Sequence, residues 1–327
     1  MVRTERNLIL VSRNQLHPAL QRELIARGLD IREADRWTEL EMSARRRLLG
    51  GATWFYGCLR YPVFAWRLRR FLHRYQAPLF AWNQDAPHYL NRASWRLDLL
   101  DRVRLLDIYA THTLIDRKRQ FADSTLYLPN AADTQCYTLN GKSLADLRNP
   151  EGFTLDVSFF GAMDGNRHKE MRGRQEFFSA LAEKLAGTGI RVHFGEAVGM
   201  TTDELVRRIQ QSRISLNFGA SCEYGAPVAS GLPERCYGIP AVGGFLLCDK
   251  RTHASDDFSP GENWVEFDGL DDCVAKIQYW LSNWDAARDL AERCHAHVMA
   301  AHTYAHRAEK LHRALLAWHD GQRGFLG

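Results

Sequence analysis

The chain has 327 residues, which is long for a single hydrophobic core and suits two domains. Its 45% hydrophobic and 25% charged residues are typical of a globular protein, and a net charge of +4 is too small by itself to indicate nucleic-acid binding. No apolar run is long enough to span a membrane and the N-terminus lacks the layout of a signal peptide, so we expect a cytoplasmic protein.

The first elements in chain order predict an α/β domain. Residues 7–12 (NLILVS) are a short apolar run typical of a central parallel strand, and residues 18–27 follow as a helix that ends at Gly28. Further buried strands are expected at residues 78–82, 107–110 and 125–128.

The segment at residues 42–84 contains no acidic residue. Its arginines and aromatic residues include Arg45, Arg46, Arg47, Trp54, Phe55, Tyr56, Arg60, Phe64, Trp66, Arg67, Arg69, Arg70, Phe71 and Arg74. Two interpretations are open: an amphipathic helix whose arginines face water while its aromatic rings pack on the sheet, or a surface for an anionic membrane or an anionic acceptor. No DNA- or RNA-binding signature accompanies the segment, so we expect no nucleic-acid partner.

A carboxylate and an imidazole, Asp85 and His88, follow the strand expected at residues 78–82. Because α/β folds place ligands at the carboxyl ends of parallel strands, either group can accept a proton from an acceptor hydroxyl. The alternative is that Asp85 caps the turn before a helix that begins near Tyr89. His112 follows another strand, where a surface or capping role is the more common one.

The alternation of strands and helices restarts in the second half of the chain. Residues 156–160 are a strand that enters Gly161, a loop with Arg167 follows, and a helix over residues 169–186 carries Arg174. A strand, a glycine and a helix N-terminus in this order can bind a phosphate through amides and the helix dipole. Further strands are expected at residues 191–194, 214–218, 245–248 and 265–267, and further helices at 203–211, 271–282, 286–300 and 306–318.

The stretch at residues 230–249 (SGLPERCYGIPAVGGFLLCD) carries the strongest functional signal. A short helix holds Glu234 and Arg235, and a glycine turn at Gly243 and Gly244 leads into an apolar strand. A glycine turn lets backbone amides approach a phosphate closely, and a nearby arginine can neutralise it. The stretch therefore predicts a phosphate site.

Neither disulfides nor a metal site is expected. The seven cysteines are odd in number and form no Cys-x-x-Cys pair, which favours buried free thiols. His295, His297, His302 and His306 lie two, five and four residues apart on helical sequence, a pattern more typical of helix faces and caps than of zinc ligands.

Several motifs in the second half, in their order and spacing, resemble the C-terminal domain of GT-B glycosyltransferases. They are residues 238–249 (GIPAVGGFLLCD), 258–265 (FSPGENWV), 270–277 (LDDCVAKI) and 302–308 (HTYAHRA). The closest likeness is to the group 1 glycosyltransferases related to the spore-coat CgeB proteins, and it covers about residues 155 to 315. In the first half, residues 82–87 (WNQDAP) and 128–133 (LPNAAD) resemble the acceptor-side loop and the hinge motif of that family.

The resemblance implies two Rossmann-like α/β domains that face each other across a cleft, at residues 1–145 and 146–302, with the linker at 140–152. Residues 303–327 resemble the helix that crosses back to the first domain. A nucleotide-diphosphate sugar is then expected on the second domain, and an acceptor, Asp85 and His88 on the first. The donor-binding residues implied are Gly161, Arg167, Arg174, Asn217, Glu234, Arg235, Gly243 and Gly244. Relatives place a glutamate where this chain has Gly238, so either Glu234 replaces it at the ribose or the ribose is held differently.

The expected reaction is metal-independent glycosyl transfer without a cofactor, because no Asp-x-Asp motif occurs and arginines can stabilise the departing diphosphate. The acceptor can be a cell-surface glycan, a lipid-linked glycan or a protein, and residues 42–84 make a peripheral membrane location attractive. The rivals are a non-catalytic module that binds a sugar nucleotide or a membrane surface, and an NAD-dependent oxidoreductase. The oxidoreductase lacks support, since no Gly-x-Gly-x-x-Gly follows a strand.

Overall fold

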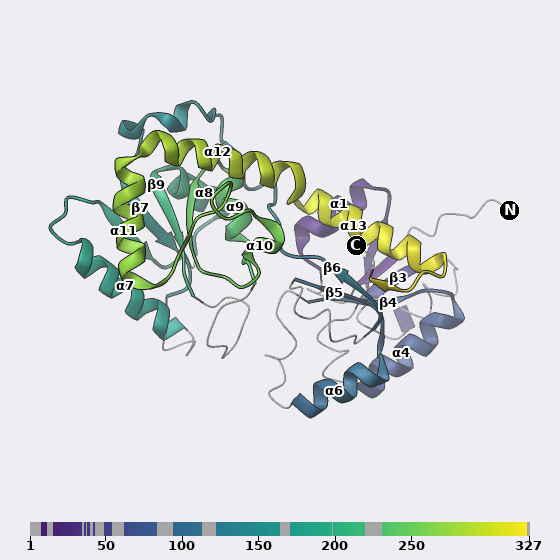
Figure 1. The fold of residues 1–327 in the computed structure, drawn as a ribbon. Coiled ribbons are helices and arrows are strands. Elements are labelled where there is room, and N and C mark those ends of the chain that lie inside the picture. Colours follow the sequence, from purple (N-terminus) through teal and green to yellow (C-terminus); the bar gives the residue numbers. More distant parts are fainter. Residues whose placement is uncertain are drawn as a thin grey trace. The chain divides into compact units, whose positions relative to one another are not determined.

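The computed structural model describes most of the chain and divides it into two compact units. The described residues are 8–11, 16–34, 36, 38–39, 42, 49–53, 62–83, 94–112, 122–163, 171–197, 199–219 and 231–325. The first unit consists of Met1–Pro129 and Tyr304–Gly327, and the second of Asn130–Thr303. The segment at residues 130–145, which the sequence analysis assigned to the first domain, therefore packs with the second unit, and the terminal helix packs with the first (Figure 1).

The first unit contains a seven-stranded parallel sheet in the order β12-β6-β5-β4-β3-β1-β2. Its strands are β1 Leu8–Val11, β2 Asp30–Glu33, β3 Leu49–Thr53, β4 Leu79–Asn83, β5 Leu106–Thr111, β6 Ala122–Tyr127 and β12 Gly324–Phe325. The apolar runs predicted β1, β4, β5 and β6. Strands β2 (DIRE) and β3 (LGGAT) were not predicted, because neither has an apolar run or a clear alternation.

The helices of the first unit are α1 Pro18–Ala26, α4 Pro62–Arg74, α6 Ser94–Val103 and α13 Tyr304–His319. Helix α1 begins where the His17 imidazole accepts a hydrogen bond from the Ala19 amide, and it ends before Gly28, whose φ of 84° suits glycine. Helix α13 runs alongside α1, and the ring of its first residue, Tyr304, stacks on His17 at 4.5 Å (Figure 1).

Helix α4 lies in the segment that lacks acidic residues, and it is amphipathic. Its inward face, which includes Ala65, Leu68 and Leu72, is buried in the core of the first unit. Arg69 also points inward and donates to the buried carboxylate of Asp107 at 2.9 Å. The structure thus shows the amphipathic helix, and Arg69 belongs to an internal ion pair rather than to a solvated face.

The second unit contains a five-stranded parallel sheet in the order β11-β10-β9-β7-β8. Its strands are β7 Leu155–Phe160, β8 Val192–Gly195, β9 Ser212–Asn217, β10 Phe245–Asp249 and β11 Glu266–Phe267. The chain leaves β7 toward β8 on one side and then returns past β7 to β9 on the other. The boundary between β7 and β9 is therefore the topological switch point, where open α/β sheets bind their ligands.

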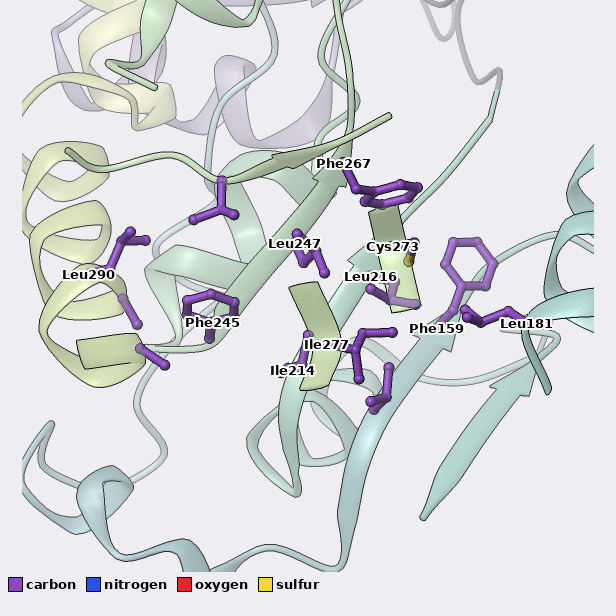
Figure 2. Packing of buried hydrophobic residues seen from close by; sticks show 14 of the residues in the cluster. Phe159, Leu181, Ile214, Leu216, Phe245, Leu247, Phe267, Cys273, Ile277 and Leu290 are labelled. Atoms are coloured by element: carbon purple, nitrogen blue, oxygen red, sulfur yellow. The ribbon is translucent and has the colours of Figure 1, made fainter. Parts of the chain in front are cut away.

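Helices cover both faces of this second sheet. They are α7 Met171–Leu185, α8 Thr202–Gln210, α9 Arg235–Ala241, α10 Ala254–Asp257, α11 Gly269–Ser282 and α12 Trp284–Ala301. One core lies between the sheet and α7 and α11, where Leu216, Leu247 and Ile277 pack together (Figure 2). The other lies toward α8, α9 and α12 and includes Val206, Ile239 and Val298. The strands alternate between the two cores, as a sheet covered on both faces requires.

The polar stretch at residues 140–152, interpreted as a linker, is folded onto the second unit. It contains short 3₁₀ turns at Asp146–Arg148 and Pro150–Gly152, and Leu147 in the first of them is buried in the core. Arg148 pairs with Glu292 of α12 at 2.7 Å, and Trp284 donates to the Arg148 carbonyl at 2.8 Å.

Five cysteines lie within the described residues, and each is a free thiol: Cys136, Cys236, Cys248, Cys273 and Cys294. Burial raises the pKa of the Cys273 thiol to about 12, so this thiol stays protonated. Among the described helices, none combines the length and apolarity needed to cross a bilayer.

Candidate functional site

The carboxyl edge of the second sheet, at the switch point between β7 and β9, gathers buried charge. Gly161 follows β7, and Gly219 follows β9 with a φ of 78°. Three arginines from three different elements meet at these two turns: Arg174, Arg235 and Arg251. We call these three side chains the arginine cluster.

Arg235 lies directly across Gly161. A Cβ atom at position 161 would be 2.6 Å from Nη2 of Arg235, so only glycine leaves room for this guanidinium. Nη1 donates to the Phe160 carbonyl at 2.9 Å, and the guanidinium lies 4.8 Å from the centre of the Phe159 ring. The Gly161 amide itself donates to the Gly195 carbonyl at 3.1 Å, so Gly161 makes space for the arginine rather than offering its own amide to a ligand.

Arg174 reaches the same point from α7 and is only 3% exposed. It donates to the carbonyls of Phe218 at 2.9 Å and of Ala162 at 2.8 Å. These bonds join the turn after β7 to the turn after β9. Arg174 thus fixes both turns while adding a positive charge beneath them.

Arg251 completes the cluster and was missed by the sequence analysis. It pairs with Asp249 at 3.1 Å and donates to the carbonyls of Gly219 at 2.7 Å and Gly231 at 2.8 Å. Asp249 also accepts hydrogen bonds from the Gly219 amide at 3.0 Å and from the Asn217 side chain at 2.8 Å. Asn217, 1% exposed, therefore orients a carboxylate from inside the protein.

The charges of the cluster do not balance. Burial, together with the neighbouring charges of Arg235 and Arg251, lowers the pKa of Arg174 to about 10. Burial also lowers the pKa of Arg235, again with a contribution from Arg251. For Arg251, burial acts to lower the pKa, but the charge of the Asp249 carboxylate acts against burial, and the net result is a raised pKa. Three guanidinium groups thus gather at one edge of the sheet, where their combined positive potential can stabilise a bound anion.

A cavity of about 270 Å³ opens beside Arg235 within the second unit. Its lining includes Glu234, Arg235, Tyr137, Phe160, Leu205 and Ile209. The Tyr137 ring occupies the space beside Gly238, because a Cβ at position 238 would lie 2.6 Å from its Cε1 atom. In this chain, Tyr137 therefore fills the place where a side chain at position 238 would stand.

Of the predicted donor-binding residues, the structure brings five to this edge: Gly161, Arg174, Asn217, Glu234 and Arg235. The sequence indicated these five residues because they follow or flank predicted strands of the second sheet. Tyr137 and Arg251 were missed, Arg251 because a single arginine after a strand carries no signal and Tyr137 because it is remote in sequence from the helix it contacts.

Gly243 and Gly244, which the sequence also assigned to a phosphate site, lie at the other edge of the sheet. Their amides donate to the carbonyls of Pro240 and Ile239, both at 2.9 Å, and so cap the C-terminus of α9. A turn that precedes a parallel strand lies at the amino edge of the sheet, away from the arginine cluster. Gly243, with a φ of 74°, packs against Leu147.

Three further predicted residues, Asp85, His88 and Arg167, lie outside the described residues.

The histidines near the C-terminus contact protein groups. His297 Nε2 lies 2.6 Å from the Asp257 carbonyl and 3.1 Å from His302 Nε2, and His295 Nδ1 lies 3.0 Å from the Pro240 carbonyl. Within the described ranges, no group of three or more His, Cys, Asp or Glu side chains has the arrangement of a metal site.

Comparison with known families and structures relates the arginine cluster to a protein family and a fold. The family described as "Glycosyl transferase-like" matches residues 169–313, which contain most of the second unit and the whole arginine cluster. The chain has the GT-B fold, and its residues 169–313 are glycosyltransferase-like in sequence. The prediction of the fold is confirmed, and the family match agrees with the predicted enzyme class rather than with an oxidoreductase.

Solved structures of glycosyltransferases share the fold of this chain at low sequence identity. Anabaena HepE, solved with UDP and glucose, is 9% identical, with a TM-score of 0.61 over 95% of this chain and 99% of that one. Sucrose-phosphate synthase from Thermosynechococcus elongatus is 11% identical, with a TM-score of 0.58 over 96% and 99%. The α,α-trehalose 6-phosphate synthase from Burkholderia multivorans is 11% identical, with a TM-score of 0.56 over 97% and 99%. A comparison with curated protein sequences gave no match.

Proposed function

We propose that this protein is a glycosyltransferase that moves a sugar from a nucleotide-diphosphate sugar to a hydroxyl acceptor. The observation that carries the proposal is the arginine cluster at the switch point of the second sheet, with its surplus of positive charge. A diphosphate is the part of such a donor that this charge suits, and Arg235, half-buried and stacked on Phe159, is the cation best placed to meet it. HepE, which shares the fold, was solved with UDP, and this supports a nucleotide donor.

Arg235 would act most strongly as the bond to the sugar breaks. Negative charge then develops on the departing diphosphate, and a cation already fixed by the Phe160 carbonyl can stabilise that charge without reorganising. Arg174 and Arg251 have their donors engaged with backbone carbonyls, so their part is to hold the turns and to add to the positive potential.

Glu234 is proposed to hold the ribose of the donor. Its carboxylate lines the same cavity as Arg235 and comes directly before it in the chain, so one ligand can reach both. A carboxylate accepts hydrogen bonds from two neighbouring hydroxyls, which is the chemistry that a ribose offers.

A binding experiment tests the donor site. Calorimetry with UDP, GDP, ADP, CMP and NADH should show tight binding of at least one nucleoside diphosphate. Arg235→Ala should weaken that binding about tenfold or more, as loss of a charge-assisted hydrogen bond does. Arg208→Ala, which removes an exposed arginine of α8, is the matched control and should leave the affinity unchanged. Binding of NADH alone, or equal affinity in the Arg235 variant, would reject the proposal.

Acceptor activation is proposed for Asp85, with His88 as the neighbouring candidate. If the Asp85 carboxylate takes the acceptor proton, Asp85→Asn abolishes transfer but keeps donor affinity. A panel of nucleotide sugars with glycan, lipid-linked and protein acceptors measures both quantities. Normal turnover in the variant would reject the assignment.

Helix α4 supports a further proposal, contact with an anionic membrane surface. Its outward face presents exposed apolar and basic side chains: Val63, Phe64, Trp66, Arg67, Arg70 and Arg74. Trp66 is 46% exposed, and the Arg70 guanidinium lies 4.8 Å from the centre of its ring. Apolar side chains beside basic ones are the pattern by which a helix lies at a membrane interface.

Vesicle sedimentation tests this surface. The protein should pellet with phosphatidylglycerol vesicles and stay in solution with phosphatidylcholine vesicles, and Trp66→Ala combined with Arg70→Ala should reduce the bound fraction severalfold. Leu316→Ala, at an exposed position of α13, is the control. Equal binding by the double variant and the control would remove α4 from the proposal.

A further inference from the structure

Two serine hydroxyls are buried side by side in the second sheet. Ser158 on β7 and Ser215 on β9 are register partners in the parallel ladder, and they are 0% and 4% exposed. Neither Oγ atom has a hydrogen-bond partner among the described residues. Two neighbouring buried hydroxyls of this kind need an explanation, because an unpaired polar group in a core is destabilising and an alanine would avoid the cost.

Both hydroxyls face the cavity that also contains Arg235. The neighbours of the two serines along the strands, Phe159 and Leu216, belong to the core toward α7 and α11. Because side chains alternate along a strand, Ser158 and Ser215 point to the opposite face, toward α8 and α9. Both line the cavity of about 270 Å³, together with Glu234 and Arg235.

The rest of the cavity wall is mostly apolar and partly aromatic. Leu205 and Ile209 come from α8, Ile239 from α9, and Phe160 and Tyr137 add aromatic rings. A flat ring that enters this space would find apolar surface against its faces and polar contacts at its edge. Partners on neighbouring strands are about 4.8 Å apart, so two hydroxyls at this spacing suit two polar atoms of one heterocycle.

We propose that Ser158 and Ser215 bind the edge of the donor nucleobase. This inference rests on the proposed function and deepens it: Arg235 meets the diphosphate, Glu234 the ribose, and the serine pair the base. A serine hydroxyl both donates and accepts, so the pair can meet the carbonyl oxygens and N–H groups that a base edge presents. The ligand also satisfies the two hydroxyls, which explains their place in the core.

Binding measurements with two probes separate base recognition from phosphate recognition. UDP carries the base, and inorganic pyrophosphate carries only the charge. Calorimetry should show that Ser158→Ala combined with Ser215→Ala weakens UDP binding about tenfold while pyrophosphate affinity changes less than twofold. Arg235→Ala should weaken both probes.

The first unit offers a matched control. Ser124 on β6 is 1% exposed, its hydroxyl has no partner within the described part of the chain, and it lines no part of this cavity. Ser124→Ala should leave the affinity for UDP unchanged. The two single variants, Ser158→Ala and Ser215→Ala, keep the test decisive if the double variant does not fold, and each should show part of the loss.

Several outcomes overturn the inference. If the serine variants bind UDP as tightly as the unmodified protein and also melt at a higher temperature, the hydroxyls contact only water, and the inference is wrong while the proposed function stands. An equal loss of UDP and pyrophosphate binding would assign the serines to general stability of the site. If the unmodified protein binds pyrophosphate but none of the nucleoside diphosphates, the proposed donor fails first and the inference falls with it.

Discussion

The two units both bury charged side chains beside a parallel sheet, but they do so at opposite edges and with a different balance. In the first unit, the carboxylate of Asp107 lies near the start of β5, at the amino edge. It accepts hydrogen bonds from the Leu79 amide at 2.7 Å and from Arg69 at 2.9 Å, and His73 lies 2.8 Å away. This buried charge is matched by its neighbours.

In the second unit, the arginine cluster lies at the carboxyl edge and has more cations than anions. Arg251 has Asp249 as its partner, while Arg174 and Arg235 rest on backbone carbonyls and the Phe159 ring. A matched group stabilises a fold, whereas a surplus of one sign is maintained where a ligand supplies the missing charge. Two features therefore distinguish a structural ion pair from a binding site in this protein. They are the net charge of the buried side chains and the edge of the sheet at which these side chains lie.

The second unit also contains a carboxylate with arginine partners at its amino edge, so the difference is not one of domain type. Asp156, near the start of β7, accepts hydrogen bonds from Arg191 at 3.0 Å, and Arg213 lies 3.6 Å away. Like Asp107, Asp156 belongs to the amino edge. Arginines paired with a carboxylate at the amino edge, and arginines held by backbone carbonyls at the carboxyl edge, are thus found within one sheet.

The largest effect is expected from Asp107→Ala. The change leaves Arg69 and the Leu79 amide without their buried partner, so the free energy of unfolding should fall by about 3 kcal/mol or more. Urea denaturation measures this, with Glu33→Ala, an exposed carboxylate on β2, as the control. UDP affinity under native conditions should stay the same, because Asp107 is no part of the donor site. Weaker UDP binding without a loss of stability would reverse the assignment.

Arg251→Ala should affect both stability and binding, because Arg251 pairs with the Asp249 carboxylate and also holds two turns. The variant buries Asp249 without its counter-charge, which should cost about 3 kcal/mol of stability. It also frees the Gly219 and Gly231 carbonyls, so UDP affinity should fall about tenfold. Arg251→Lys restores the charge but cannot hold both turns, and it should recover stability better than affinity. Full recovery of both by lysine would contradict the clamping role.

The sequence predicted the strands that are apolar and buried, and with them the right edge of the second sheet. Strands β7 and β10 each follow from a short apolar run; Arg174 was selected on the helix that follows β7, and Arg235 as the arginine near the glycine turn before β10. Strands β2 and β3 carry polar residues or glycines, so their place in the sheet comes from pairing with neighbours that the sequence does not reveal.

The site was harder to predict where it depends on packing between distant segments. Tyr137 meets Gly238 across about a hundred residues of sequence, and no pattern at either position indicates this contact. Gly243 and Gly244 illustrate a different difficulty, since a glycine turn looks the same in sequence whether it holds a phosphate or caps a helix. Which strand end the turn occupies decides between the two, and this turn precedes its strand.

Gly161→Ala tests whether the position of Arg235 matters. The new methyl group would lie 2.6 Å from Nη2, so the guanidinium must move, and UDP affinity should fall about fivefold with a stability loss of about 1 kcal/mol. Gly173→Ala is the matched control, because an added Cβ in α7 meets nothing within 4 Å. That control should gain about 0.5 kcal/mol from helix propensity and keep its affinity. Unchanged affinity in both variants would show that Arg235 binds no donor.

The smallest effect concerns Asp156 and its dependence on pH. Burial alone would raise the pKa of this carboxyl, but the hydrogen bonds from Arg191 and the charge of Arg213 hold it below the ordinary value of 3.8. The folded state therefore releases this proton more readily than the unfolded state, so the stabilisation is present above the ordinary pKa and is lost as the pH falls through the folded value.

Asp156→Asn should thus lower the free energy of unfolding by about 1 kcal/mol at pH 7, a modest figure because the Arg191 side chain is half exposed. The difference from the unmodified protein should shrink as the pH drops below 4, when both chains carry a neutral side chain at this position. Urea denaturation across this range measures the difference, and UDP affinity at pH 7 should not change. A difference that stays constant with pH would show that shape rather than charge sets the contribution of Asp156, and the contrast between the two sheet edges would then rest on the arginine cluster alone.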